Sequence, residues 1–207
     1  MKLVFASNNA HKLDEVRAIM PAEVQILSLH DIGFEQEIEE NGTTLEENSK
    51  IKAEAVYQWL RVTGYGLPVD GVFADDTGLE IDALNGQPGV YTARWYLSNG
   101  EGRTVNGERE IFAANRAKAL QELKDKTNRG AQFRTVITLI KVSGERLAVS
   151  GVVRGRIATE EYGQGGFGYD PVFIPEGYDK TFGELPAEIK NGISHRARAL
   201  QALVQIL

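Results

Sequence analysis

The sequence predicts an α/β fold with a mixed sheet. Short apolar runs of strand length alternate with segments whose apolar residues recur at helical spacing, and two long β-rich runs flank a short turn. The chain has 207 residues, of which 42% are hydrophobic. This is enough for a real core, so residues 1–207 are expected to form a single domain, in one piece or in two closely joined lobes.

The first part of the chain predicts one strand and two helices. Lys2–Ala6 is an apolar run typical of a buried strand, and Ala10–Met20 carries apolar residues at helical spacing. Thr44 and Glu47 have the spacing of a capping box, which predicts a second helix from Thr44 to about Leu60.

The middle of the chain predicts two short strands, at Val72–Asp75 and Leu79–Ala83. Ser98–Glu110 is polar and glycine-containing, which indicates an exposed loop, and a long helix is expected from Glu108 to about Lys124.

The last part predicts a β-hairpin and a final helix. Phe133–Val142 and Arg146–Gly155 are β-rich runs that turn at Ser143–Gly144. The helix begins at Ser194 and places four apolar residues on one face, namely Leu200, Leu203, Val204 and Leu207.

Charge and composition exclude several classes of protein. The net charge is −6 and the isoelectric point about 5.2, which argues against general binding to nucleic acid or to membrane surfaces. Cysteine is absent, which excludes disulfides, zinc–thiolate sites and a cysteine nucleophile. The N-terminal apolar run is too short for a signal peptide, and no segment approaches transmembrane length, so we expect a cytoplasmic protein.

The segment Phe5–Lys12 predicts an anion site. A strand ends in Ser7, Asn8 and Asn9 and a helix follows at once, so backbone N–H groups and the positive end of the helix dipole meet there. Lys12, one turn into the helix, adds a full charge. Ser and Asn are also favoured N-caps, so plain helix capping is the alternative interpretation.

Asp75 and Asp76 stand side by side where an apolar run ends, followed by Thr77 and Gly78. Mg²⁺ is usually held by one or two carboxylates together with waters and substrate phosphates, so the pair predicts a cation site. An Asp-rich turn is the alternative.

The second helix carries Lys52 near the middle of its apolar face. A lysine there points either to water, as long basic side chains often do, or into a cleft at an anion. Three acidic residues lie around the start of this helix and could supply metal ligands, namely Glu39, Glu40 and Glu47. The alternative for Glu47 is helix capping, and the alternative for Glu39 and Glu40 is a solvated loop.

Gly163–Phe173 contains a formal G-x-G-x-x-G, but Pro171 prevents the helix that a dinucleotide-binding fingerprint needs. What remains is a glycine loop that presents Phe167 and Tyr169 beside Asp170, suited to stacking on a base and hydrogen-bonding its edge. A glycine-rich turn with core aromatics is the alternative.

Lys190, His195 and Arg196 place positive charge at the start of the last helix, where it opposes the helix dipole unless a ligand binds nearby. Ordinary exposed charges at a helix start are the alternative, because they cost only tenths of a kcal/mol.

Six blocks occur in order along the chain, from residue 2 to the C-terminal helix. They are Ser7-Asn8-Asn9…Lys12, Glu39-Glu40…Gly42…Glu47-Asn48, Ala74-Asp75-Asp76-Thr77-Gly78-Leu79, Gly86…Pro88-Gly89-Val90-Tyr91…Ala93-Arg94, Gly165-Gly166-Phe167-Gly168-Tyr169-Asp170-Pro171 and Ser194-His195-Arg196. Together they resemble the inosine triphosphate pyrophosphatase family, also called XTP/dITP diphosphatases. Two departures are Ser49, where alanine is common, and the length and polarity of Ser98–Glu110.

The resemblance implies an elongated, twisted mixed sheet with flanking helices, in two lobes around a central cleft, and a homodimer. It implies Mg²⁺-dependent hydrolysis of deaminated purine nucleotides (ITP, dITP and XTP) to the monophosphate and pyrophosphate, which cleanses the nucleotide pool. Asp76 would be the catalytic residue and a metal ligand, Glu39 would share the metal, and Glu47 is a further candidate ligand. The substrate-binding residues that it implies are Ser7, Asn8, Asn9, Ala10, His11, Lys12, Lys52, Thr77, Phe167, Gly168, Tyr169, Asp170, Lys190, His195 and Arg196.

Two other functions stay open at this point. A related pyrophosphatase class with a similar fold acts on modified pyrimidine or methylated nucleotides, although the Gly-Gly-Phe-Gly-Tyr-Asp-Pro and Ser-His-Arg blocks favour purines. The other is a nucleotide-binding regulator without catalysis, which would not need Asp76 and the acidic residues near it.

Overall fold

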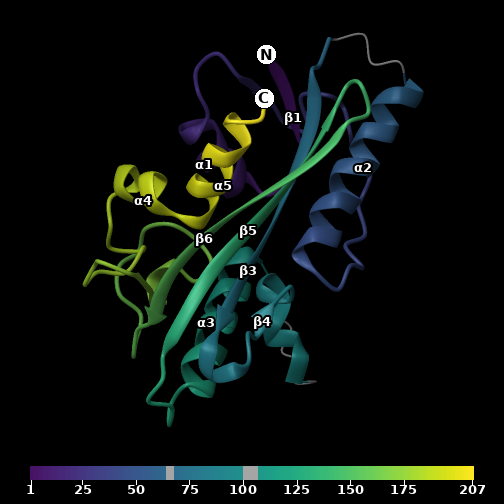
Figure 1. Ribbon diagram of the computed structural model, residues 1–207. Helices are drawn as coiled ribbons and strands as arrows, with labels where there is room; N and C mark the ends of the chain where they lie inside the picture. The colour runs from purple at the N-terminus through teal and green to yellow at the C-terminus, as the bar shows by residue number, and fades with distance from the viewer. Residues whose placement is uncertain (64–67, 100–106) are drawn as a thin grey trace. The chain divides into compact units, whose positions relative to one another are not determined.

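The computed structural model describes residues 1–63, 68–99 and 107–207 (Figure 1). Contacts among these residues divide the chain into two units. Unit 1 comprises Met1–Asp76, Thr135–Gly151 and Ser194–Leu207, and unit 2 comprises Thr77–Arg134 and Val152–Ile193. Strands and helices occur in both, and parallel and antiparallel strand pairs both occur, so the predicted α/β class with a mixed sheet is confirmed.

The elements of unit 1 are β1 (Lys2–Phe5), α1 (Ala10–Ile19), β2 (Gln25–Leu27), α2 (Leu45–Thr63) and α5 (His195–Val204). The boundary between the units falls within three long strands, β3 (Gly71–Ile81), β5 (Gly130–Lys141) and β6 (Arg146–Ile157). In unit 2 lie η1 (Asp82–Leu84), β4 (Pro88–Gly89), η2 (Thr92–Asn99), α3 (Glu108–Glu122), η3 (Asp170–Val172), β7 (Phe173–Pro175) and α4 (Ala187–Ile193).

In unit 1, helices cover both faces of the sheet. The strand order is β2-β1-β3-β5-β6, and β1 pairs in parallel with both β2 and β3. Successive strand residues point to opposite faces, so Val4 packs on the side of α2 while Leu3 and Phe5 pack on the side of α1 and α5 (Figure 1). Strands buried on both faces must be apolar throughout, which explains the continuous apolar run in β1.

The helix starts and buried helix faces of unit 1 agree with the sequence prediction. At the start of α2, Thr44 Oγ1 accepts a hydrogen bond from Glu47 N at 3.1 Å, and Glu47 Oε2 accepts one from Thr44 N at 3.2 Å, which confirms the capping box. At the start of α5, Ser194 Oγ accepts from Ala197 N at 3.1 Å, which confirms that cap. Of the four residues predicted on its apolar face, Leu200 and Leu203 are buried and Val204 is half-buried, whereas Leu207 lies beyond the end of α5.

The prediction of two strands at Val72–Asp75 and Leu79–Ala83 is wrong, because β3 runs without interruption through Thr77 and Gly78. The predicted break followed from the charges of Asp75 and Asp76, which are unfavourable inside a strand when unpaired. In the structure both carboxylates have positively charged partners, so the strand continues.

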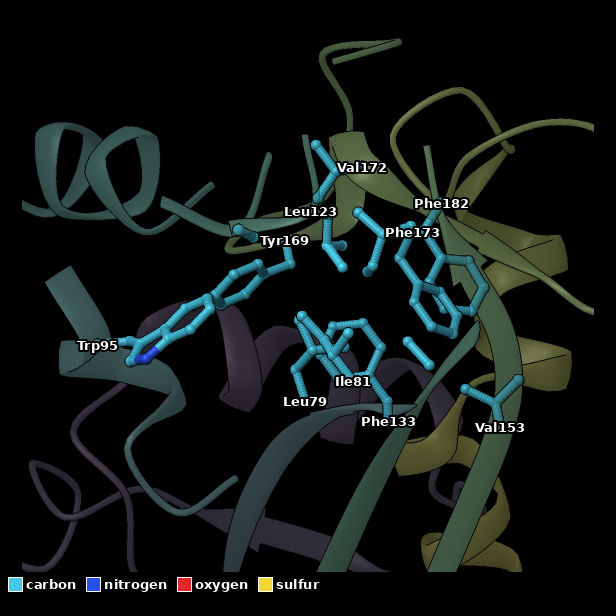
Figure 2. Packing of buried hydrophobic residues seen from close by; sticks show 13 residues of the cluster. Leu79, Ile81, Trp95, Leu123, Phe133, Val153, Tyr169, Val172, Phe173 and Phe182 are labelled. Carbon is cyan, nitrogen blue, oxygen red and sulfur yellow. The ribbon is translucent and has the colours of Figure 1, made fainter. Parts of the chain in front are cut away.

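Unit 2 has a separate hydrophobic core (Figure 2). β4 pairs antiparallel with β3, and β7 pairs antiparallel with β6. The core gathers apolar side chains from β3, η2, α3, β5, β6, η3 and β7 and from the adjoining loops: Leu79, Ile81, Trp95, Ala119, Leu123, Ala131, Phe133, Val153, Ile157, Tyr169, Val172, Phe173 and Phe182. The aromatic residues interlock, with the rings of Phe173 and Phe182 stacked at 5.4 Å between centroids.

The remaining predictions of elements have mixed outcomes. β5 and β6 are neighbours joined by a turn, in which Gly144 N donates to Lys141 O at 2.8 Å, so the predicted hairpin turn is confirmed. The sequence prediction did not include the short elements β2, β4, β7 and α4. Most of the predicted loop Ser98–Glu110 lies outside the described residues, and its last three residues form the first turn of α3. None of the helices in the described residues is long and apolar enough to cross a membrane.

Close packing of β6 against α5 leads to a test of the fold. A Cβ atom on Gly151 would lie 2.2 Å from His195 O and 2.3 Å from Ala199 N, both of them backbone atoms. We expect Gly151→Ala to lower the free energy of unfolding by about 2–3 kcal/mol, because this overpacking must displace α5. The measurement is urea unfolding followed by circular dichroism.

The matched control is Gly192→Ala in α4, where nothing lies within 4 Å of the added Cβ. This variant should be neutral or more stable by about 0.5–1 kcal/mol, because alanine favours the helix. Equal stability of Gly151→Ala and the wild type would contradict the close packing of β6 on α5.

Candidate active site

The junction of β1 and α1 has the geometry that the sequence predicts. Asn9 caps α1 and its Oδ1 accepts a hydrogen bond from Lys12 N at 2.9 Å, while Ser7 Oγ accepts from Asn9 N at 3.3 Å. Asn8, Ala10 and His11 are exposed at this helix start. The junction therefore presents the positive end of the α1 dipole to solvent, as an anion site requires.

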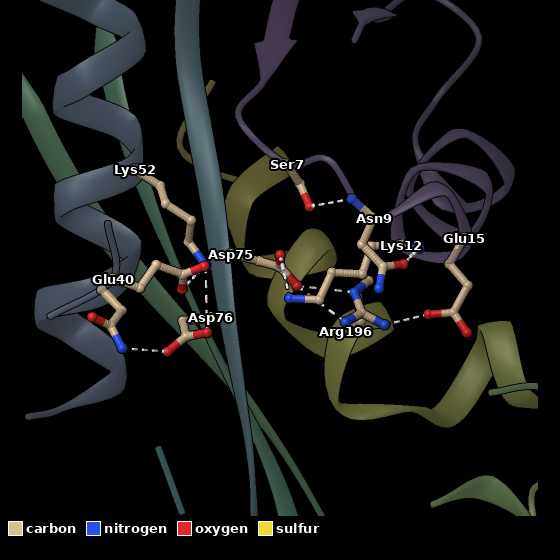
Figure 3. Close-up of polar contacts among 10 residues, drawn as sticks. Ser7, Asn9, Lys12, Glu15, Glu40, Lys52, Asp75, Asp76 and Arg196 are labelled. Carbon is tan, nitrogen blue, oxygen red and sulfur yellow. Dashed lines mark hydrogen bonds and ion pairs between the residues drawn. The ribbon is translucent and has the colours of Figure 1, made fainter. Parts of the chain in front are cut away.

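Asp75 is the centre of a buried ion network in unit 1 (Figure 3). Lys12 Nζ lies 2.9 Å from Asp75 Oδ1, and Arg196 donates from Nε and Nη2 to Asp75 Oδ2, at 3.1 Å each. Arg196 Nη1 also donates to Glu15 Oε2. Asp75 and Arg196 are each only 1% exposed, so this network is shielded from water.

The charges of this network shift the pKa values of its members. Burial alone would raise the pKa of the Asp75 carboxyl, but Lys12, Arg196 and Lys52 outweigh it and hold that pKa well below its usual range. Burial lowers the pKa of Lys12 despite its pairing with Asp75. Asp75 therefore stays ionised at every physiological pH and balances the positive charges around it.

Asp76 points to the other face of β3, toward α2 (Figure 3). Asn48 Nδ2 donates to Asp76 Oδ2 at 3.3 Å, and Lys52 Nζ lies 3.4 Å from Asp76 Oδ1. The same Lys52 Nζ lies 2.6 Å from Glu40 Oε2. Burial, together with the charges of Glu40 and Asp75, raises the pKa of Asp76 although Lys52 and Lys12 oppose the shift.

The two adjacent aspartates therefore have different partners. Asp75 is neutralised inside the protein by Lys12 and Arg196, and Asp76 is held by α2 beside Glu40. The alternation of side chains along a strand separates the two carboxylates, so their adjacency in the sequence does not by itself require a shared cation.

The acidic residues around α2 separate into three cases. Glu47 Oε2 accepts hydrogen bonds from Thr43 N at 2.6 Å and Thr43 Oγ1 at 2.8 Å as part of the helix cap, and these bonds lower the pKa of Glu47. Glu39 is exposed. Glu40 is the acidic residue of this group whose carboxylate shares Lys52 with Asp76.

The described residues contain no group of three or more His, Cys, Asp or Glu side chains placed to hold a metal ion. Two carboxylates, however, converge on one point, since Glu40 and Asp76 both contact Lys52 Nζ. A hard divalent cation takes oxygen ligands and commonly only one or two protein carboxylates, the rest being waters and phosphates. The carboxylates of Glu40 and Asp76 offer oxygen atoms of this kind, so this donor set fits such an ion.

In unit 2, a glycine loop is held by a buried ion pair. Asp170 Oδ2 accepts hydrogen bonds from Phe167 N at 2.8 Å and from Lys190 Nζ at 2.5 Å. Gly166 has a φ of +69°, and a Cβ there would lie 1.9 Å from Asp170 Oδ2, so only glycine fits. The Lys190 ammonium also lies 5.0 Å from the centre of the Phe167 ring.

The other predicted site residues have varied environments. Tyr169 is buried in the core of unit 2 and its hydroxyl donates to Thr92 O at 3.1 Å, and burial raises its pKa. Thr77 lies in β3 and is half-buried, and His195 is buried at the first turn of α5. The predicted contacts of these three residues with a substrate stay predictions.

The predicted site residues do not include Glu15 and Asn48. Glu15 follows Lys12 by three residues on α1, and this spacing places the two side chains on one helix face. Asn48 precedes Lys52 by four residues on α2 in the same way, and it also binds Gly42 N through Oδ1 at 2.9 Å. Helical spacing from the predicted lysines is the sequence feature that could have identified both.

Capped helix starts, buried lysines and two neighbouring carboxylates on an α/β framework are features typical of proteins that bind phosphate groups together with a divalent cation. Comparison with known proteins is more specific. The chain belongs to the Ham1 family, whose family model matches residues 3–206. The family resemblance found in six sequence blocks is thereby confirmed.

Similar proteins cover the whole chain. A dITP/XTP pyrophosphatase of Flavobacterium johnsoniae is 46% identical over 207 residues, which cover all of this chain and 98% of that protein. A dITP/XTP pyrophosphatase of Porphyromonas gingivalis is 45% identical over 207 residues, which cover all of this chain and 97% of that protein. The solved Ham1 protein of Staphylococcus aureus superposes with a TM-score of 0.81 at 37% identity, covering all of this chain and 97% of that chain.

The ion network around Asp75 leads to a stability prediction. Asp75→Asn leaves the buried charges of Lys12 and Arg196 without their shared partner, so we expect it to lower the free energy of unfolding by about 3–5 kcal/mol. Urea unfolding measures the change. The control is Glu54→Gln, which breaks the exposed pair with Arg146 and should cost at most about 1 kcal/mol. Similar small losses in both variants would contradict a buried network.

Proposed function

We propose that this chain hydrolyses dITP and XTP, as the names of its relatives suggest, and also ITP, as the family resemblance implies, each to the corresponding monophosphate and pyrophosphate. The observation that carries the proposal is the setting of Asp76. It is a carboxylate with a raised pKa, oriented by Asn48 and Lys52 and next to a second carboxylate, Glu40. Such a group can orient a water molecule and accept its proton.

The proposed roles in unit 1 follow from charge and position. Ser7, Asn8, Asn9, Ala10 and His11 form the start of α1 and would bind phosphate oxygens through backbone N–H groups and polar side chains, together with Lys12. Lys52 would neutralise charge on the phosphates while it holds Asp76. Asp76 would position the water that attacks the α-phosphorus and take its proton, and the bond from this phosphorus to the pyrophosphate oxygen would break.

Glu40 and Asp76 would hold a Mg²⁺ ion, which when bound supplies charge stabilisation for the phosphates and the leaving pyrophosphate. The resemblance implied Glu39 for this role and Glu47 as a further candidate. The geometry favours Glu40, because its carboxylate lies beside Asp76 whereas the Glu47 carboxylate caps α2.

In unit 2 the glycine loop would bind the base. The Phe167 ring offers a stacking surface, and Gly168 offers backbone groups. Asp170 and Lys190 support the loop through their ion pair. The resemblance also assigns Tyr169 and Thr77 of unit 2 and His195 and Arg196 of unit 1 to substrate binding. Hypoxanthine and xanthine differ from adenine by a carbonyl at C6, so a donor directed at that position would be left unpaired by adenine.

The experiment that tests the function is a hydrolysis assay with ITP, dITP, XTP, ATP and GTP in the presence of Mg²⁺, with and without added inorganic pyrophosphatase. We expect phosphate from ITP, dITP and XTP only when the pyrophosphatase is present, because cleavage between the α- and β-phosphates releases pyrophosphate. Orthophosphate without the helper enzyme would indicate a different bond. If modified pyrimidine nucleotides are tested in the same assay, turnover of these alone would support the related pyrophosphatase class, and nucleotide binding without any turnover would support the non-catalytic regulator.

Asp76→Asn tests the assigned catalytic group. We expect kcat to fall by about 10²–10⁴, because the amide cannot accept the proton, while the dissociation constant of ITP measured in EDTA, without a divalent cation, changes little. The size of the side chain is preserved, so a loss confined to kcat separates chemistry from binding. Undiminished turnover would remove Asp76 from the mechanism.

Glu40→Gln and Glu39→Gln form a matched pair that tests the metal ligands. Glu40→Gln should raise the Mg²⁺ concentration for half-maximal activity at least about tenfold, because Glu40 shares Lys52 with Asp76. Glu39→Gln should leave this concentration unchanged, because Glu39 is exposed. Activity titrated with Mg²⁺ measures both. The opposite order of effects would restore Glu39 as the ligand.

Other features stay predictions. A homodimer, a cytoplasmic location and the behaviour of residues 1–207 as a single domain follow from the family resemblance and from composition. Light scattering of the purified protein would measure its mass in solution, and single-transition thermal unfolding would support one domain.

A further inference from the structure

We propose that Arg116 of α3 is a positioning residue that holds the glycine loop of residues 165–170 in its base-binding conformation. This role rests on the proposed function, because it concerns how tightly that loop binds a purine base. Arg116 has no place among the substrate-binding residues discussed above.

Arg116 contacts the loop directly. Its Nη1 donates a hydrogen bond to Gly168 O at 2.9 Å, and its Nε lies 3.0 Å from Glu161 Oε2. The Arg116 side chain is 14% exposed, so its bond to the loop carbonyl is largely protected from competing water. A charged donor in such a setting forms a stronger hydrogen bond than a neutral one.

A second residue of α3 contacts the same loop one turn earlier. Phe112 precedes Arg116 by four residues, which places both side chains on one face of the helix. The rings of Phe112 and Phe167 lie 6.1 Å apart at an angle of 45°. Two consecutive loop residues, Phe167 and Gly168, are therefore held by two consecutive turns of α3.

The loop needs such support because of its backbone. Gly166 and Gly168 have φ values of +69° and +60°, and glycine has more conformational freedom to lose than any other residue. The bonds of Asp170 to Phe167 N and Lys190 fix the loop at Phe167, and the Arg116 bond fixes the next carbonyl. A loop that is ordered before the ligand arrives binds more tightly, because less entropy is lost on binding.

The helix that carries Arg116 is itself anchored. Asn115 Oδ1 accepts a hydrogen bond from Tyr96 N at 2.8 Å and its Nδ2 donates to Ala93 O at 3.0 Å. Lys118 Nζ donates to Trp95 O at 3.0 Å. Arg116 thus lies on a helix fixed to η2, as a residue that positions a binding loop requires.

The experiment compares Arg116→Gln with the wild type in three measurements. The KM for ITP should rise about tenfold with kcat changed less than about twofold, because one charged hydrogen bond is lost. The dissociation constant of IMP, measured by calorimetry, should rise by a similar factor. The inhibition constant of tripolyphosphate, which has no base, should stay unchanged.

Two further variants complete the design. Arg154→Gln is the matched control. Arg154 is an arginine of unit 2 that donates hydrogen bonds to Asp82 and Gln132, so its variant should behave like the wild type in all three measurements. Glu161→Gln removes the ion-pair partner of Arg116 but keeps the arginine, and it should raise the dissociation constant of IMP by a smaller factor.

Several results would overturn the role of Arg116. They are unchanged IMP binding in Arg116→Gln, equal weakening of IMP and tripolyphosphate, and, if Arg116→Gln does not fold, unchanged IMP binding in Glu161→Gln. Wild-type protein that binds IMP without hydrolysing ITP would instead refute the proposed function and leave the comparison of IMP affinities valid. Wild-type protein that hydrolyses ITP but binds no IMP would refute the role of Arg116 and leave the proposed function standing.

Discussion

The buried carboxylate of Asp75 is the constraint on which the arrangement of unit 1 depends. It is neutralised by Lys12 of α1 and Arg196 of α5, two residues that are far from β3 in the chain. A buried charge without its partner costs several kcal/mol. Separation of α1 or α5 from β3 would remove one of the cations that neutralise Asp75, and it is therefore unfavourable. Because apolar replacements of buried ion pairs are often equally stable, we interpret the network as a device that fixes position: it holds the start of α1 and the start of α5 against β3.

This internal neutralisation leaves Asp76 in a different state from its neighbour. The pleat of β3 directs the two side chains to opposite faces, so Asp75 faces its cations while Asp76 faces Lys52 and Asn48 of α2. Burial and nearby acidic groups raise the pKa of Asp76, which means that its ionised form is less favourable than that of a carboxyl group in water. Shifted pKa values of this kind are common at functional sites, because a charged group whose interactions within the protein are complete has little capacity left to bind a ligand.

In unit 2, the main constraint is that the flexible backbone of the glycine loop must be held in one conformation. Its loop contains glycines with positive φ, and it is tied by the carboxylate of Asp170 and by the Arg116 guanidinium. Much of this support comes from polar groups on the surrounding elements, while Tyr169, within the same segment, extends into the apolar core of the unit. Rigid support of a glycine loop from its surroundings is the usual way to combine close backbone approach with a defined shape.

Local rules account for what the sequence determined by itself. The capping box of Thr44 and Glu47, the cap of Ser194, the buried face of α5 and the anion-binding geometry at Asn9 all depend on residues within four positions of one another, so their spacing predicts them. The family followed from blocks in a fixed order. The tertiary structure alone decided that β3 continues through Asp75, that Glu40 shares Lys52 with Asp76, and that Arg116 reaches Gly168. In each of these cases the deciding partner is at least 12 residues away in the chain. The spacing of residues in the sequence does not reveal which charged or polar groups folding will bring within about 3 Å of each other.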